Sequence, residues 1–185
     1  MFTILKMLRR ATGQPDQGAV AMLGIKSGDR VLILGASRPV LAGAIGHLTG
    51  LNGQTTVVDQ TPGADVRIAK GAADAGALVD FVNAPVTMLP TDSQTFDMAV
   101  LPAGLAALGK GAPSVLAEAI RVVRPGGRIT ICEPLPRPGL FRLAQQAPVT
   151  DPKDVVARLT AAGLRAARHL GSLDGTAYFE AARPR

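Results

Sequence analysis

The stretch VLILGASRPV, residues 31–40, has the residue types and spacing of a loop that holds a nucleotide-type cofactor. An apolar run ends at Gly35, and helical spacing begins near Pro39. Such a turn presents backbone N–H groups at a helix N-terminus, where anionic groups bind. Arg38 places a cation beside them, able to pair with a carboxylate or a phosphate. Ser37 is predicted to cap the helix and Pro39 to occupy its first turn.

Other side chains capable of chemistry fall inside predicted helices and strands, which favours structural roles for them. His47 lies in a predicted helix, and His169 and Cys132 lie in predicted strands. A single cysteine excludes an internal disulfide and a multi-cysteine metal site, so we predict no metal centre and a reducing compartment. The segment LPAGLAALGKG, residues 101–111, offers no base directly after its strand, and Lys110 lies well along it. No catalytic residue is therefore assigned.

Short β-branched segments and Ala- and Leu-rich helical segments alternate along the chain. The expected strands are 30–36, 54–60, 78–84, 96–103 and 127–134. The expected helices are 39–50, 63–75, 113–123 and 152–163. Strict alternation predicts an α/β fold, a doubly wound and mostly parallel sheet with helices on both faces. In such a sheet a ligand lies beyond the carboxyl ends of the strands, where the strand order reverses.

The two ends of the chain depart from this alternation. Residues 164–171 and 175–183 are two alternating runs joined by SLD, which predicts an antiparallel hairpin at the sheet edge. Residues 1–25 predict a helical lead-in: an amphipathic first helix with a basic end, then a second short helix over 16–25 that ends at Gly24. No linker divides the chain, so we expect residues 1–185 to form a single domain.

Composition and charge limit the classes of protein to which this chain can belong. Of 185 residues, 47% are hydrophobic and 18% charged, enough for one packed core. The formal net charge is +6, but the basic residues are dispersed and not interleaved with aromatics, which argues against nucleic acid as a partner. With no secretion signal or long apolar run, we expect a cytoplasmic protein. The basic helix within 1–10 either covers the sheet or docks peripherally on a membrane surface or a protein partner.

The letters GASR resemble the cofactor turn of the short-chain dehydrogenases. That family also needs a Tyr four residues before a Lys, and the single tyrosine, Tyr178, is followed at that spacing by Ala182. The resemblance is therefore confined to one turn.

Four longer segments together resemble the class I S-adenosylmethionine-dependent methyltransferases, of the small-molecule, type 11-like group. They are LGIKSGDRVLILGAS (23–37), TTVVDQTP (55–62), LPTDSQTFDMAVL (89–101) and LAEAIRVVRPGGRITICEP (116–134). The last is the most specific, because a Pro-Gly-Gly turn there is expected to lead a helix directly into the fifth strand. The resemblance implies a seven-stranded sheet with an antiparallel C-terminal hairpin.

The same resemblance assigns a cofactor site. Asp59 stands where the family places the acid that accepts hydrogen bonds from the ribose hydroxyls, and a turn-capping role is its alternative. The positions implied to contact S-adenosylmethionine are Gly35, Ala36, Ser37, Arg38, Asp59, Gln60, Asn83, Ala84 and Leu101.

The cofactor loop is degenerate in comparison with that family. Ile33 replaces the acid of the first strand, Ser37 and Pro39 replace two glycines, and the third strand is followed by Asn83-Ala84-Pro85 in place of an acid. Two functions stay open: a methyltransferase with a weakened S-adenosylmethionine site, acting on a small-molecule or protein acceptor, or an inactive member serving as an accessory or interaction subunit.

Overall fold

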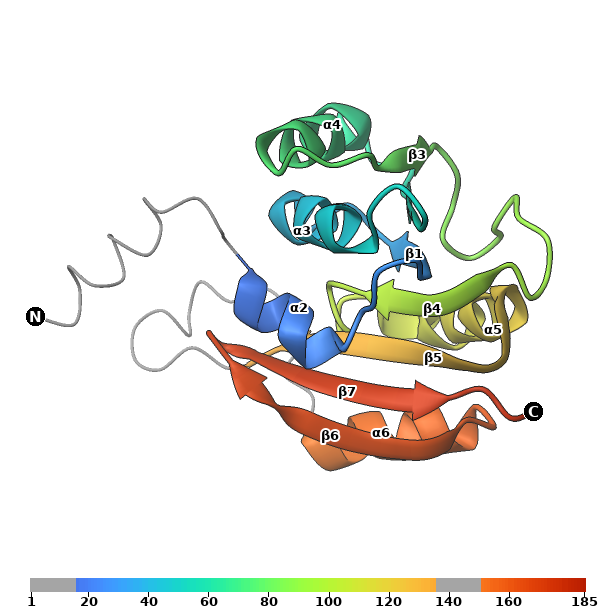
Figure 1. Cartoon of the computed structure of the whole chain (residues 1–185). Helices are drawn as coiled ribbons and strands as arrows, with labels where there is room; N and C mark the ends of the chain where they lie inside the picture. The colour runs from blue at the N-terminus through green and yellow to red at the C-terminus, as the bar shows by residue number, and fades with distance from the viewer. Residues whose placement is uncertain (1–15, 136–150) are drawn as a thin grey trace, which may run out of the picture.

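The computed structural model describes residues 16–135 and 151–185, which form one seven-stranded sheet with helices on both faces (Figure 1). In chain order the elements are α2 (Gln17–Leu23), β1 (Arg30–Leu34), α3 (Pro39–Thr49), β2 (Gln54–Val58), α4 (Ala64–Asp74), β3 (Asp80–Val82), β4 (Phe96–Leu101), the short 3-10 helix η1 (Gly109–Gly111), α5 (Ala112–Val122), β5 (Val123–Pro134), α6 (Pro152–Ala161), β6 (Arg165–Leu173) and β7 (Thr176–Ala182).

The strand order is β3-β2-β1-β4-β5-β7-β6, and the first five strands are parallel. The chain therefore reverses direction across the sheet between β1 and β4, which is the place where doubly wound sheets bind ligands. The antiparallel β7 lies between β5 and β6. The predicted doubly wound α/β fold with a C-terminal hairpin is confirmed.

The core consists of two apolar clusters, one on each face of the sheet. Alternate residues of each strand point to opposite faces. Ile33 thus joins the cluster under α2, α3 and α4, whereas Leu32 and Leu34 join the cluster under α5 and α6. The parallel strands are covered on both sides, which is why their sequences are nearly continuous apolar runs.

β1, β2 and β4 each end two residues before their predicted ends, and β3 and β5 differ most from their predicted bounds. β3 is only Asp80–Val82, because the flanking residues of the expected 78–84 segment do not pair with β2. β5 begins at Val123, directly after α5, so the Pro-Gly-Gly turn lies inside the strand as a bulge opposite Phe96 and Met98. Only Gly126 has a positive φ there, 76°. Gly127 is needed for space, since an added Cβ would meet the carbonyl oxygen of Asp97 at 2.6 Å.

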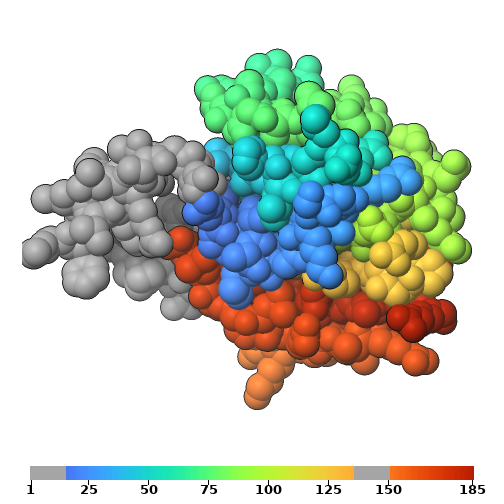
Figure 2. Space-filling view, in the orientation of Figure 1, coloured from blue at the N-terminus to red at the C-terminus, as the bar shows by residue number. Residues whose placement is uncertain are grey.

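The helix expected over 16–25 forms as α2 and ends at Gly24, whose φ is 61°. Arg128 on β5 donates to the Gly24 carbonyl at 2.8 Å and pairs with Glu180 on β7, also at 2.8 Å. A cation at the C-terminus of α2 is favourable and ties this helix to the sheet. Figure 2 shows α2 lying directly against the C-terminal hairpin.

The first predicted helix, within 1–15, and most of the segment between β5 and α6, 136–150, lie outside the described residues. Within residues 16–135 and 151–185, no helix is both long enough and apolar enough to cross a bilayer.

Candidate functional site

The predicted cofactor residues all follow or end parallel strands, at one edge of the sheet. Gly35 to Arg38 follow β1, Asp59 and Gln60 follow β2, Asn83 and Ala84 follow β3, and Leu101 ends β4. Because these strands are adjacent and parallel, their carboxyl ends meet at the same edge, astride the reversal between β1 and β4. The fold brings together what the sequence places up to 66 positions apart.

Asp59 is the central polar residue of this edge. Its Oδ2 accepts the N–H of Ala36 at 2.6 Å, and its Oδ1 accepts the N–H of Thr61 at 2.6 Å. The second contact is an Asx turn, so the turn-capping alternative is confirmed. The first contact holds the cofactor loop. An ionised carboxylate has about four acceptor positions, so both oxygens keep capacity for a ligand hydroxyl.

The pKa of Asp59 reflects these contacts. Desolvation by burial raises it, but hydrogen bonds from Thr61 and Ala36 and the charge of Arg67 outweigh that effect, and the pKa lies below its usual range. The carboxylate is therefore ionised at neutral pH, which leaves both oxygens as acceptors.

Gly35 forms the turn itself. Its N–H donates to the Val58 carbonyl at 2.9 Å, and its φ is 103°. Among the described residues, only Asp59 Oδ2 would lie within 4 Å of an added Cβ, at 4.0 Å. Glycine is therefore needed here for the backbone conformation.

A helix capped by Ser37 would begin at Arg38, but α3 begins one residue later, at Pro39. Pro39 is the first helical residue, so Arg38 occupies the N-cap position and makes no side-chain capping bond. Proline is favoured at N1 because its fixed φ suits the helix and its missing N–H needs no partner. Ser37 is exposed on the loop, and its predicted role as N-cap is wrong.

Arg38 does not project freely into solvent. It pairs with Asp16 at the start of α2 at 3.1 Å, and each of the two side chains is 25% exposed. Asp16 has a left-handed backbone, φ 74°, and does not cap its own helix. Burial lowers the pKa of Arg38, but the neighbouring Tyr178 hydroxyl and the Asp16 carboxylate outweigh it and raise the pKa. Its Nη1 is buried and has no hydrogen-bond partner of good geometry among the described residues.

The remaining positions contribute little polar chemistry. Ile33 is 2% exposed in the core under α3, so this position offers no group to a ligand's ammonium. Asn83 and Gln60 are exposed, whereas the Leu101 side chain is buried against α5 and α6. Only the backbone of Leu101 is left for a ligand.

Sequence reasoning missed Glu133, at the end of β5. This carboxylate is 2% exposed, and it accepts the N–H of Leu105 at 2.7 Å and that of Ala106 at 3.2 Å. Gly104 makes room for it, since an added Cβ would lie 2.5 Å from Glu133 Oε2. Glu133 therefore fixes the segment after β4. The available signal was an acid at the end of an otherwise apolar strand, RITICEP.

The fold and this edge define a doubly wound α/β protein with a cofactor-type loop at its strand reversal. Residues 39–131 match the family model described as "Methyltransferase domain". The chain belongs to this family, the class I S-adenosylmethionine-dependent methyltransferases.

Relatives and solved structures agree with the family. The chain is 29% identical over 119 residues to the ubiquinone/menaquinone biosynthesis C-methyltransferase UbiE of Pseudomonas putida, an alignment that covers 62% of this chain and 45% of the relative. The chain thus spans about half the length of the curated relatives it matches. A SAM-dependent methyltransferase of Aquifex aeolicus superposes with a TM-score of 0.75 at 18% identity, over 98% and 97% of the two chains. The [4+2]-cyclase SpnF superposes at 0.70 and 18% identity, over 91% and 80%.

The residues present fit S-adenosylmethionine at two of its parts. The ionised Asp59 carboxylate lies against the Gly35-Ala36 turn at the ligand edge, suited to the ribose hydroxyls. Arg38 is a cation beside the same loop, of the type that pairs with the methionine carboxylate, and its Nη2 is engaged by Asp16. At Ile33 and Pro85 the chain has no acid for the ammonium or the adenine.

Proposed function

We propose that this protein binds S-adenosylmethionine weakly and transfers its methyl group to a small-molecule acceptor. The observation that carries the proposal is the ionised Asp59, held against the Gly35 loop at the strand reversal of a methyltransferase-family fold. The C-methyltransferase name of the Pseudomonas relative, in ubiquinone and menaquinone biosynthesis, supports a small-molecule acceptor.

In this proposal S-adenosylmethionine supplies an electrophilic methyl group. Asp59 accepts hydrogen bonds from the ribose hydroxyls, and Arg38 donates to the carboxylate. Glu133 holds the backbone at Leu105 and Ala106 beside the reaction space. Leu101, Pro102 and Ala103 supply no base, so the chain acts by proximity and orientation, and the acceptor brings its own nucleophile.

The expected affinity is low. Each missing charged hydrogen bond, at Ile33 and at the segment after β3, weakens binding by about 1.5–3 kcal/mol, roughly tenfold or more apiece. Two such losses move a micromolar dissociation constant toward the millimolar range.

Calorimetric titration with S-adenosylhomocysteine tests the proposal. We expect the natural chain to bind, Asp59→Asn to weaken binding at least tenfold, and Asp65→Asn, on the exposed first turn of α4, to leave it unchanged. Thermal unfolding of each variant checks that it folds. No binding at millimolar ligand, or equal binding by the Asp59 and Asp65 variants, would refute the proposal.

A second ligand separates the two charged groups. Methylthioadenosine has the ribose and adenine of the cofactor but not its amino-acid end. Arg38→Gln should therefore weaken S-adenosylhomocysteine and leave methylthioadenosine unaffected. Equal loss for both ligands would remove Arg38 from the carboxylate role.

The second candidate is a non-catalytic accessory subunit. It is favoured by the Arg38–Asp16 pair, which engages the cation of the cofactor loop within the protein, and by the apolar burial of Ile33. The cyclase neighbour illustrates that the fold does not imply one reaction. In this case the basic segment 1–10 would serve as the contact with a protein partner or membrane surface, and the natural chain would not bind either ligand.

A further inference from the structure

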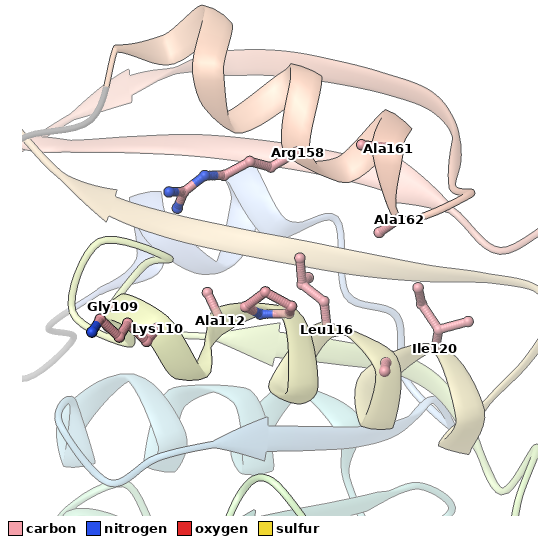
Figure 3. Close-up of a pocket in the computed structure, with 10 residues that line it drawn as sticks. Gly109, Lys110, Ala112, Leu116, Ile120, Arg158, Ala161 and Ala162 are labelled. Atoms are coloured by element: carbon pink, nitrogen blue, oxygen red, sulfur yellow. The ribbon is translucent and has the colours of Figure 1, made fainter.

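A groove of about 440 Å³ lies between α5 and α6, on the face of the sheet opposite α2, α3 and α4 (Figure 3). None of the predicted cofactor residues lines it. Its walls come from the end of the segment after β4 and from the two helices. The lining residues are Gly109, Lys110, Ala112, Pro113, Leu116, Ala117, Ile120, Arg158, Ala161 and Ala162.

The groove exists because the two helices face each other with small side chains. Ala117 on α5 and Ala161 on α6 are both exposed, and neither reaches across. On the other face, α3 and α4 close their gap because Gly43 and Gly71 allow backbone contact, and an added Cβ at Gly43 would collide with the Gly71 carbonyl. The volume of the α5–α6 groove falls in the range of small-molecule sites, about 300–1,000 Å³.

The groove is apolar along its length and cationic at one end. Figure 3 shows Leu116, Ile120 and Ala162 along the apolar part, and the Arg158 guanidinium extending toward the end at which Lys110 lies. None of the described residues that line the groove is acidic. Within residues 16–135 and 151–185, neither cation takes part in an ion pair. An apolar wall with two cations at one end suits an amphipathic anion. Its alkyl chain would be buried against the apolar wall, and its anionic group would stay near solvent beside the two cations.

We propose that the α5–α6 groove binds a free, single-chain amphipathic carboxylate, with the carboxylate between Lys110 and Arg158 and the alkyl chain along Leu116 and Ile120. This inference is independent of methyl transfer, because the groove shares no residue with the candidate cofactor site.

The test is calorimetric titration of the full chain with laurate below its micelle concentration. We expect one laurate per chain. Acetate, which has the head without the tail, and dodecylammonium, which has a tail of matched length with the opposite charge, should not bind. Decanoate, two methylenes shorter, should bind roughly 15-fold more weakly.

Matched variants locate the site. Lys110→Gln and Arg158→Gln should each weaken laurate about three- to fivefold, the range of an exposed charge contact. Lys153→Gln, a cation on the same helix outside the groove, should have no effect. Ala117→Phe should fill the groove and abolish binding, whereas Ala157→Phe, exposed on α6 and outside the lining, should not.

Several results would overturn the inference. They are no binding of laurate, equal binding of dodecylammonium, or equal effects of the groove variants and their controls. Sedimentation with phosphatidylglycerol vesicles addresses the alternative source of anionic heads, and binding to vesicles without binding of free laurate would also overturn it. Circular dichroism establishes that each variant is folded before titration.

Discussion

Asp59 and Arg38 carry the two charges of the candidate cofactor site. Asp59 accepts hydrogen bonds from the N–H groups of Ala36 and Thr61, and Arg38 pairs with Asp16. Asp59 is found from the sequence because it directly follows the β-branched run of a predicted strand, a position that topology brings to the ligand edge. The partner of Arg38 is not found in this way. Asp16 lies 22 residues earlier, in a lead-in whose place over the loop depends on the packing of α2 against the hairpin.

Glu118 shows how a single residue joins a helix to a loop. It accepts the N–H of Leu89 at 2.7 Å and pairs with Arg121, which in turn donates to the carbonyls of Leu89 and Thr91. The hydrogen bond from Arg121 is the main cause that lowers the pKa of Glu118, against the effect of burial, to about 2. This carboxylate therefore secures the loop that leads into β4.

Glu118→Gln should destabilise the fold by about 1–2 kcal/mol at pH 7, an amount reduced for the 19% exposure of the side chain. Because the folded pKa is the lower one, the carboxylate stabilises the fold fully above pH 4.5, and the contribution disappears as pH falls toward 2. Urea unfolding of both chains between pH 7 and pH 2.5 measures the difference. A difference that does not shrink on acidification would contradict this account.

At the scale of elements, α3 and α4 pack through glycine. An added Cβ at Gly71 would meet the backbone carbonyl group of Pro39, the first residue of α3. The close approach sets the start of α3 and with it the cofactor loop. The sequence predicts a helix over 63–75, but it does not show that Gly71 faces another backbone.

Gly71→Ala should therefore destabilise the chain, although alanine in a helix is usually about 1 kcal/mol better than glycine. We expect a net loss of about 1–3 kcal/mol from overpacking, measured by urea unfolding. Gly111→Ala is the control, since no atom of the described residues lies within 4 Å of its added Cβ and its φ is −78°. It should change stability by less than about 0.5 kcal/mol. A stabilised Gly71 variant would show that the helices are not in contact there.

At the scale of the whole molecule, all seven strands form one sheet, and β7 is inserted between β5 and β6. Tyr178 and Phe179 on β7 are buried on opposite faces, in the two core clusters. β7 is therefore part of both cores.

We expect unfolding in urea to be a single cooperative transition. Tyr178 is the only tyrosine and there is no tryptophan, so intrinsic fluorescence reports on β7 alone, while far-ultraviolet circular dichroism reports on all elements. The two transitions should coincide in midpoint and slope. Separate midpoints would mean that the C-terminal hairpin unfolds independently of the parallel sheet.

The sequence by itself determined the order of elements, the doubly wound sheet and the strand ends that form the ligand edge. These features depend on the periodicity of apolar residues and on the glycines and prolines that end helices and strands, and both signals act over a few residues. Tertiary structure alone decided which groups lie together: Asp16 with Arg38, Glu133 with the backbone after β4, and Lys110 and Arg158 in the lining of one groove. Such contacts join segments distant along the chain, and only the packing of helices and strands determines their distances.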